Sequence, residues 1–464
     1  MLRIKTRKEL IAKIAEEAFC ENLGLFVGTG FSMAMDERTC DFKGLVASIY
    51  EDNYESNFED ALKKKYLGMS YPQIVEDIEK KKSGTIGKKR IRKRIESIVV
   101  KKCSINLDEI IEGGENKKRK EEMDLVKGAL NEIKPQWVIT TNYDLVLEQL
   151  IDNYETIGPN NPFSMHRRTI PIFHLHGHVN NPENIVISEK DYVKLLNPIE
   201  YRQIKLSSIL AESSVIFLGY SLNDVNVRSA LEQAKLYSLS SCDSEKGNPK
   251  LRVLFYYDKT AEDDKDDVIK QEEDLFILKA RDVKKFLTDI KNEFLEYKKS
   301  FEQLIKEILN STPGKIDFSL KIKNLKKDVQ NRVSDKLIKS LDDFRFVVKE
   351  NNREFTLEFE QITNMFLNLL EKDIILDLKP MLIHKMALLL NLFGQLQATY
   401  PSISKKWSAN TFRITSKVEK RFRHLAMTNG YRGLEKILNK NIECIDESQA
   451  NPFNDYAQIL AWGE

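Results

Sequence analysis

Short apolar runs and amphipathic stretches alternate over the first 280 residues of the chain. The apolar runs predict β-strands at 23–27, 137–140, 170–173, 184–187, 214–218, 251–256 and 274–278. The stretches between them carry apolar residues at helical spacing, which predicts helices at 5–22, 42–65, 72–80, 86–101, 119–132 and 143–152. Apolar strands separated by helices are typical of a mostly parallel sheet that is buried on both faces. The pattern therefore predicts an α/β fold with a helical insertion at about residues 42–132.

The pattern changes near residue 282, after which only helical periodicity remains. Ser311-Thr312-Pro313-Gly314 is the clearest break in the chain. Beyond it, helices are predicted at 319–350, 353–371, 378–398, 416–427 and 430–441. The helix at 378–398 is so rich in apolar residues that we expect it in a helical bundle or a subunit interface. We therefore divide the chain into an α/β domain at 1–295 and an all-α domain at 296–464.

Composition and charge narrow the class of protein. The chain has 464 residues, of which 41% are hydrophobic and 31% charged, as in a globular protein of two or three domains. Its net charge of +2 gives no reason to expect binding to nucleic acid or to an anionic membrane. No apolar run approaches the length that crosses a bilayer, and the N-terminus continues into an amphipathic helix, so a cytoplasmic location is expected.

The cysteines exclude two further classes. They lie far apart and include no C-x-x-C pair: Cys20, Cys40, Cys103, Cys242 and Cys444. Neither a cysteine-rich structural zinc site nor a disulfide framework is indicated, and we expect no zinc.

Three of the predicted strands end in small polar residues. Gly28-Thr29-Gly30-Phe31-Ser32 follows the first strand, and such glycines let N–H groups point at a phosphate. The third glycine of the dinucleotide fingerprint is missing, so an ordinary strand-to-helix turn would look the same. Thr140-Thr141-Asn142-Tyr143-Asp144 and 219–224 follow the other two strands. The Asn142 amide suits a ribose hydroxyl or a water, although capping of the next helix is an equally compatible role.

The run Ile172-Phe173-His174-Leu175-His176-Gly177-His178 contains three of the chain's six histidines. A histidine at a strand end beside a glycine is well placed to move a proton near neutral pH. The alternative is that the histidines satisfy polar groups in the core or bind a metal. Carboxyl ends of parallel strands share one edge of a sheet, so all four polar loops are expected there. A Rossmann-like sheet with a nucleotide at its switch point accounts for them most simply.

Taken together, GTGFS, TTNYD, HLHG and FLGYSLND resemble the NAD-binding core of the sirtuin family. More narrowly, they resemble the sirtuin-like domains of bacterial anti-phage defence proteins, over about residues 10–290. The resemblance implies that His176 is the catalytic base and that Asn142 acts beside it at the nicotinamide ribose; His174 and His178 only flank the base. It also implies that NAD is held by Gly28, Thr29, Gly30, Ser32, Asp144, Gly219, Ser221 and Asn223.

Two departures from the sirtuin pattern bear on the reaction. Protein-deacylating sirtuins usually carry a four-cysteine zinc module, and their glycine loop continues into Pro-Asp-Phe-Arg, whereas here Ser32 is followed by Met-Ala-Met-Asp-Glu-Arg. The resemblance therefore implies an NAD+ hydrolase (NADase) with NAD as substrate, which gives nicotinamide and ADP-ribose and depletes NAD in anti-phage defence. An NAD-dependent protein deacylase and a non-catalytic nucleotide sensor with a partner-binding helical half stay open as alternatives.

An NADase must be held inactive until it is triggered. The helical domain at 296–464 is the expected place for that control, because it offers apolar helices and no second α/β ligand pocket. We expect it to form homo-oligomers and to dock a regulatory partner, such as a HerA-like ATPase encoded by a neighbouring gene or a phage-derived trigger.

Overall fold

The computed structural model describes residues 4–80, 85–111, 117–162, 169–195, 201–222, 224–240, 250–257, 269–272 and 275–310, and then 322, 325, 329–339, 365, 369, 382, 385 and 386. Residues 1–298 and 299–464 form two compact units. The first unit contains the sheet and the candidate site.

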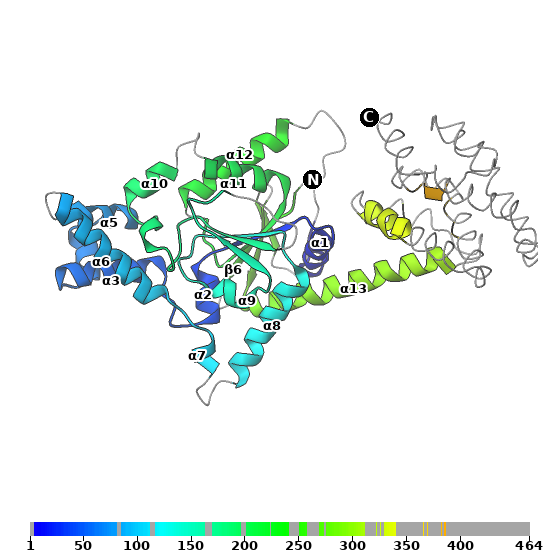
Figure 1. The fold of residues 1–464 in the computed structure, drawn as a ribbon, viewed down its shortest axis with the longest axis horizontal. Helices are drawn as coiled ribbons and strands as arrows, with labels where there is room; N and C mark the ends of the chain where they lie inside the picture. Colours follow the sequence, from blue (N-terminus) through cyan, green and yellow to red (C-terminus); the bar gives the residue numbers. More distant parts are fainter. Residues whose placement is uncertain are drawn as a thin grey trace, which may run out of the picture. The chain divides into compact units, whose positions relative to one another are not determined.

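An eight-stranded sheet lies at the centre of the first unit, with the strand order β3-β4-β2-β1-β5-β6-β8-β7 (Figure 1). The strands are β1 (Leu23–Val27), β2 (Trp137–Thr140), β3 (Tyr154–Ile157), β4 (Ile170–His174), β5 (Ser214–Leu218), β6 (Arg252–Tyr257), β7 (Ile269–Glu272) and β8 (Leu275–Ala280). Every pairing is parallel except that of β7 with β8. The predicted Rossmann-like, mostly parallel sheet is confirmed.

One predicted strand is wrong, and two strands were not predicted. Residues 185–187 form no strand; they follow a short 3-10 turn, η1 (Pro182–Asn184), and Ile185 and Ile187 pack into a helical core instead. Their apolar character therefore reflects burial against helices. β3 and β7 are the two edge strands of the sheet. Edge strands need no apolar run, because one side of each is unpaired, so the criterion of continuous hydrophobicity passes over them.

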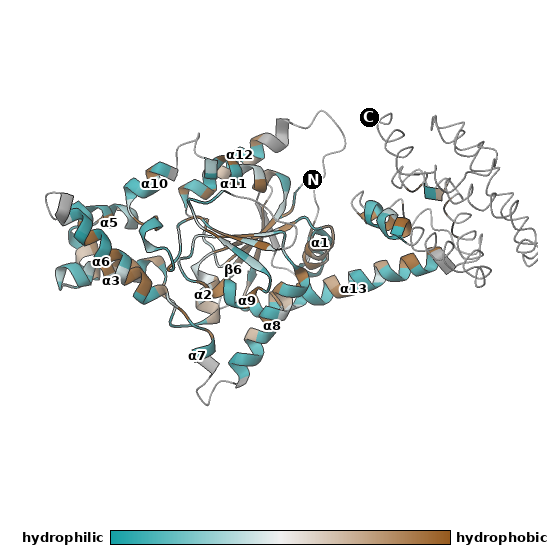
Figure 2. Ribbon diagram, in the orientation of Figure 1, coloured by the Kyte–Doolittle hydropathy of each residue, from teal (hydrophilic) through white to brown (hydrophobic). Residues whose placement is uncertain are grey.

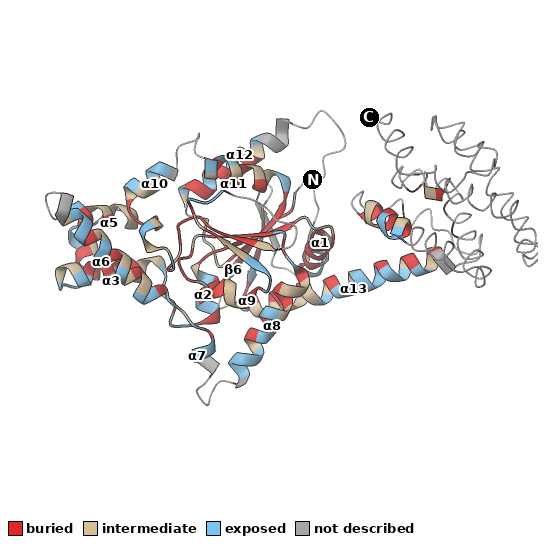
Figure 3. Ribbon diagram, in the orientation of Figure 1, coloured by how far each residue is buried: buried red, intermediate tan, exposed pale blue. Residues whose placement is uncertain are grey.

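Helices cover both faces of the sheet (Figure 1). On one face lie α11 (Tyr201–Glu212) and α12 (Val225–Ser240). The other face carries α1 (Arg7–Phe19), α8 (Lys117–Ile133), α9 (Val146–Leu150) and the start of α13 (Val283–Asn310). β1, β2 and β5 are buried along their whole length (Figure 3), which explains their continuous apolar sequence. Brown and teal alternate along α13 (Figure 2), as in an amphipathic helix.

A tryptophan anchors the centre of this sheet. Trp137 at the start of β2 is fully buried, and its Nε1 donates to Ser213 Oγ at 3.2 Å. The ring occupies the space above Gly24 on β1, where an added Cβ would lie 2.0 Å from it. Gly24 therefore gives the indole room between adjacent strands.

A group of helices stands apart from the sheet (Figure 1, blue). After α2 (Thr29–Met35) come α3 (Phe42–Tyr54), α4 (Phe58–Lys64), α5 (Tyr71–Lys80) and α6 (Thr85–Cys103). Ile49, Ile78 and Ile95 belong to a buried core that these four helices share. The chain then passes through α7 (Asp108–Ile111) to α8, which contacts α1 and α9. Within the predicted insertion, α3 to α6 thus form the separate body, and we call residues 42–103 the insertion.

Arg92 on α6 fastens the insertion to the segment that follows β4. Its guanidinium contacts Asp191 Oδ2 at 2.8 Å and Glu79 Oε1 at 3.1 Å, and it also donates to the carbonyl of Ile185. Asp191 lies on α10 (Glu189–Leu195). The side chain of Arg92 is only 20% exposed, so these charge pairs are shielded from solvent.

Most of the predicted C-terminal helices lie outside the described residues. Residues 329–339 are helical, within the helix predicted at 319–350. Of the helix predicted at 378–398, only 382, 385 and 386 are described. Among the residues that the structure describes, none of the helices combines the length and the apolar character needed to cross a membrane.

Candidate functional site

The glycine turn after β1 lies against the turn after β5. Gly28 N–H donates to the carbonyl of Leu218 at 2.9 Å, and Gly30 N–H donates to the carbonyl of Gly219 at 3.0 Å. Gly219 has a φ of +58°, and a Cβ there would lie 2.0 Å from Phe31 N. The strand order also reverses here, since β2 and β5 lie on opposite sides of β1. The glycines therefore let two backbone turns meet at the topological switch point.

This contact leaves few N–H groups of the turn for a ligand. Besides the two bonds above, Phe31 N–H donates to the carbonyl of Gly28 at 3.0 Å. A phosphate would have to replace these bonds to be held by Gly28 or Gly30 N–H. Thr29 is the residue of this turn that lines the neighbouring cavity. A pyrophosphate-binding role for Gly28 and Gly30 stays a prediction.

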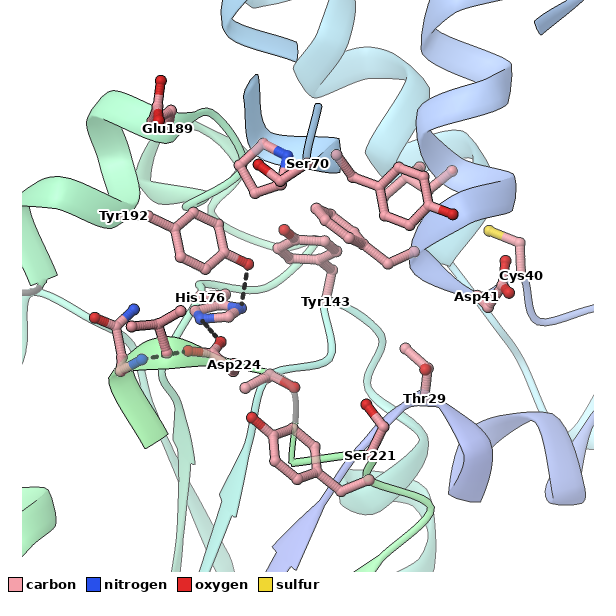
Figure 4. Close-up of a pocket in the computed structure, with 18 of the residues that line it drawn as sticks. Thr29, Cys40, Asp41, Ser70, Tyr143, His176, Glu189, Tyr192, Ser221 and Asp224 are labelled. Carbon is pink, nitrogen blue, oxygen red and sulfur yellow. Dashed lines mark hydrogen bonds and ion pairs between the residues drawn. The ribbon is translucent and has the colours of Figure 1, made fainter. Parts of the chain in front are cut away.

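A cavity of about 820 Å³ opens beyond the carboxyl ends of β1, β2, β4 and β5. The loops after these four strands line one side of it, and the insertion and α10 line the other (Figure 4). All four polar loops singled out in the sequence thus contribute to one cavity. Its volume falls in the range of ligand and cofactor pockets, about 300–1,000 Å³.

The predicted site residues divide between the cavity wall and the layer next to it. Five of them line the cavity: Thr29, Asp144, His176, Gly219 and Ser221. Four others are described but do not line it: Gly28, Gly30, Ser32 and Asn142. Asn223 lies outside the described residues.

His176 has a hydrogen-bond partner at each ring nitrogen (Figure 4). Its Nε2 lies 3.2 Å from Asp224 Oδ2, and its Nδ1 lies 3.4 Å from the Tyr192 hydroxyl. A carboxylate only accepts, so Nε2 carries a proton and donates to Asp224. In the neutral ring, Nδ1 is then the acceptor, and it accepts a hydrogen bond from the Tyr192 hydroxyl. The basic position of His176 therefore faces Tyr192 at the cavity.

The partners of His176 differ in charge. Burial raises the pKa of Asp224, but the hydrogen bond from His176, the charge of that ring whenever it is protonated, and two backbone N–H groups outweigh burial, so the pKa lies below its ordinary value. Burial, with the nearby Asp224 charge, raises the pKa of Tyr192 well above its ordinary value. At neutral pH Asp224 is therefore a carboxylate and Tyr192 a neutral phenol. The bond from Tyr192 is long, so a substrate hydroxyl or a water can replace it.

A second buried chain of hydrogen bonds joins the turn after β1 to the loop after β2. Asn142 Nδ2 donates to Ser32 Oγ at 2.9 Å, and Ser32 Oγ donates to Asp144 Oδ1 at 3.0 Å. Burial raises the pKa of Asp144, although the Val146 N–H and the Ser32 hydroxyl oppose this. Within the described part of the chain, Asn142 Oδ1 is buried and has no hydrogen-bond partner. Such an acceptor fits a ligand hydroxyl or a water at this position.

His174 holds the neighbouring loop in place. Its Nδ1 contacts the carbonyl of Asn142 at 3.0 Å, and its Nε2 lies 2.9 Å from Glu148 Oε1. The ring of His178 packs on that of His174, with centroids 5.1 Å apart, and burial lowers the pKa of His178. Neither ring lines the cavity. Among the described side chains, no group of three or more His, Cys, Asp or Glu is arranged to hold a metal ion.

The structure adds residues to which the sequence analysis gave no role. Asp224 belongs to the same strand-end loop as Ser221, so the argument that selected Ser221 also covers it. Tyr192 lies on α10, and Tyr66 and Tyr71 come from the insertion. No strand-end pattern marks these tyrosines, because they lie on α10 and in the insertion and not in the loops that follow the strands.

A mostly parallel sheet with a cavity over its switch point is typical of nucleotide-binding α/β proteins. Residues 136–278, from β2 to β8, match the family model described as the SIR2-like domain. The chain therefore carries a sirtuin-like domain, a fold that implies NAD binding and is often found in NAD-utilising enzymes. The matched residues include His176 and Asp224. A search of curated proteins found no match to the chain.

Proposed function

We propose that the chain is an NAD+ hydrolase that cleaves the bond between nicotinamide and ribose and releases nicotinamide and ADP-ribose. The observation that carries this proposal is the His176–Asp224 pair in the cavity over the switch point. The sirtuin-like domain supports NAD as the ligand. The unpartnered Asn142 Oδ1 and the volume of the cavity fit a ligand with ribose hydroxyls.

The main energetic cost of cleaving this bond arises at the ribose. Nicotinamide leaves as a neutral molecule from a cationic ring, so no general acid is required. The cost is the positive charge that develops on the ribose, which fixed dipoles in a water-poor pocket stabilise. Burial raises the pKa of Asp144, which indicates a low-dielectric surrounding of this kind.

His176 is the general base in this proposal. Its Nδ1 takes a proton from a ribose hydroxyl or from the incoming water, in place of the hydrogen bond from Tyr192. Asp224 accepts from Nε2 and stabilises the positive charge that the ring then gains. Asn142 lies in the layer next to the cavity and is anchored through Ser32, and its Oδ1 is the acceptor that would orient a water or a ribose hydroxyl reaching that layer.

The test is nicotinamide release by the purified full-length chain, followed by liquid chromatography with NAD as the sole substrate. His176→Ala should lower the rate by about 100-fold or more, because general bases contribute on that scale. His178→Ala is the matched control, since that ring lies near the same strand end but outside the cavity. His174→Ala is unsuitable as a control, because its buried ring holds Glu148 and Asn142.

Each alternative predicts a different result. Nicotinamide release that requires an acyl-lysine peptide would identify a deacylase. Binding of NAD in calorimetry without nicotinamide release would identify a sensor. Activity retained by His176→Ala, with circular dichroism unchanged, would overturn the assignment of the base.

We further propose that this reaction depletes NAD during phage infection. The resemblance of the four sequence motifs to the sirtuin-like domains of anti-phage defence proteins is the reason for proposing this role. Cells that carry the unmodified chain should lose NAD after infection, whereas cells with His176→Ala should keep it. Equal NAD levels in both strains would contradict the proposed role.

A further inference from the structure

Two cysteines lie in the wall of the cavity and have no part in the proposed reaction. Cys103 is buried, Cys40 is half-buried, and both line the cavity. Cys40 packs against the buried cluster to which Cys103 belongs, and the two thiols interact with each other. Figure 4 shows the sulfur of Cys40 close to Asp41. The structure thus brings together two nucleophilic groups that are far apart in the sequence.

The pair stands where the insertion joins the sheet domain. Cys40 directly precedes Asp41, the N-cap of α3, and Cys103 is the last residue of α6. The chain segments beside the two cysteines also touch, since Arg38 Nη2 donates to the carbonyl of Asn106 at 3.2 Å. We call residues 38–41 and 103–107 the neck. A covalent bond across the neck would close the whole insertion into a loop.

The two thiols differ in acidity. The hydrogen bond from Cys103 lowers the pKa of Cys40, and the Lys102 charge adds to this effect against the opposing effect of burial. The contact with Cys40 and burial raise the pKa of Cys103. Because the thiolate is the reactive form, Cys40 is the nucleophile of the pair and Cys103 its protonated neighbour.

We propose that Cys40 and Cys103 are a redox-sensitive dithiol that closes to a disulfide across the neck when the chain meets a peroxide. The Cys40 thiolate attacks hydrogen peroxide, which gives a sulfenic acid and hydroxide. The sulfur of Cys103 then attacks the sulfenic sulfur, the S–S bond forms, and the sulfenic hydroxyl leaves as water with the proton of the Cys103 thiol. The hydroxide from the first step becomes the second water by taking up the proton that Cys40 had lost to the solvent. In sum, two thiols and one peroxide give one disulfide and two waters. The proposed oxidation does not rest on the proposed NAD chemistry, although the two thiols line the same cavity.

The test uses the full-length chain with Cys20, Cys242 and Cys444 replaced by serine, so that Cys40 and Cys103 are the two remaining thiols. After treatment with equimolar hydrogen peroxide and then iodoacetamide, intact mass should show the loss of two hydrogens and no alkylation. Peptide mapping should find the Cys40–Cys103 cross-link. In urea the same bond should form at least about tenfold more slowly, because an unfolded insertion keeps the thiols apart. If the serine variant folds poorly, the same peptide mapping on the unmodified chain gives a second measurement. There the alkylation of Cys20 is the internal comparison for that of Cys40 and Cys103.

Single replacements separate the roles of the two thiols. With Cys103→Ser, Cys40 should accumulate as a sulfenic acid that dimedone traps, whereas Cys40→Ser should leave Cys103 largely unreacted. The oxidised chain should also unfold at a higher temperature than the dithiothreitol-reduced chain, because the bond restricts the unfolded insertion. Complete alkylation of both cysteines after peroxide, or a cross-link that forms as fast in urea, would overturn the proposal.

Discussion

Asp224 serves two elements at once. Its Oδ2 accepts from His176 Nε2 at 3.2 Å, and its Oδ1 accepts from the Asn226 N–H at 2.8 Å, in the first turn of α12. The capping bond fixes the carboxylate, and the fixed carboxylate selects which nitrogen of His176 carries the proton. One side chain thus couples the start of a helix to the basic position of the candidate base.

Asp224→Asn tests this coupling. The oxygen of asparagine can still cap α12, but its NH2 group would then face Nε2 and favour the ring form with the proton on Nδ1. That form has no basic nitrogen toward the cavity. If the proposed NADase reaction holds, kcat for nicotinamide release should fall about 100-fold while KM changes little.

Asp282→Asn is the matched control for this variant. Asp282 also caps a helix, by accepting from the Lys284 N–H at 2.7 Å at the start of α13, and it does not line the cavity. Its replacement should leave kcat unchanged. Equal losses of kcat in the two variants would show that Asp224 acts only as a helix cap.

Asp144 predicts a dependence of stability on pH. Burial raises its pKa in the folded chain above the ordinary value of 3.8. The unfolded chain loses this proton first, so the contribution of Asp144 to stability is full below that value and declines as the pH rises through the folded pKa. Asp144→Asn cannot ionise. Its free energy of unfolding relative to the unmodified chain should therefore rise from about pH 4 to about pH 7 in urea titrations. A difference that stays constant with pH would contradict the prediction.

For single residues, the sequence predicted where the candidate site lies better than it predicted the role of each residue in that site. Thr29, Asp144, His176, Gly219 and Ser221 were predictable because parallel strands present their carboxyl ends at one edge. Asp224 lies in the same loop as Ser221, but an aspartate before a helix is usually read as a helix cap. Asp224 does fill that role as well. The N–H groups of Gly28 and Gly30 were expected to be free for a phosphate; only the fold reveals their bonds to the turn after β5.

At the scale of elements, the insertion forms one wall of the cavity and depends on a few charged contacts for its position. Arg92 joins α6 to α5 through Glu79 and to α10 through Asp191. Glu79 also pairs with Lys190 of α10. Since α10 carries Tyr192, these contacts connect the insertion to the partner of His176.

Arg92→Ala should loosen this wall. It leaves the shielded carboxylate of Asp191 without the cation it pairs with, while Glu79 keeps Lys190, and this loss costs about 3 kcal/mol. Amide hydrogen exchange in α5, α6 and α10 should speed up by about 100-fold, with the sheet unaffected. Arg94→Ala is the control on the same helix, because Arg94 is 56% exposed and pairs with Asp52 at the surface. Unchanged exchange in Arg92→Ala would show that the shared apolar core alone holds the insertion.

The elements themselves were predictable where burial imposes a pattern. β1, β2, β4, β5, β6 and β8 were found because each is an apolar run within the sheet. Residues 185–187 misled the prediction, because packing against the insertion produces the same apolar run as a strand. The edge strand β3 escaped it, because Tyr154 and Glu155 are not fully buried.

At the scale of the molecule, the chain consists of two compact units, and the first has its own sheet, helices and cavity. We propose that the second unit assembles the chain into homo-oligomers and docks a regulatory partner, such as an ATPase from a neighbouring gene or a phage-derived trigger. The apolar sequence at 378–398 supports this proposal.

A chain that ends at residue 312 should therefore fold and sediment as a monomer, whereas the full-length chain should sediment as an oligomer at micromolar concentration. Analytical ultracentrifugation, with circular dichroism to confirm folding, measures both. A full-length monomer, or a shortened chain that forms the same oligomer, would contradict the assembly role of the second unit.

The packing of Trp137 over Gly24 makes the first unit optically distinct. The chain's other tryptophans are Trp407 and Trp462, so a chain ending at residue 312 keeps Trp137 alone. Its indole is fully buried between strands, and its N–H is bound to Ser213. Fluorescence from this one residue should be blue-shifted in the folded sheet and should move to longer wavelength only when β1 and β2 separate. The sheet thus contains its own spectroscopic probe, placed outside the wall of the cavity.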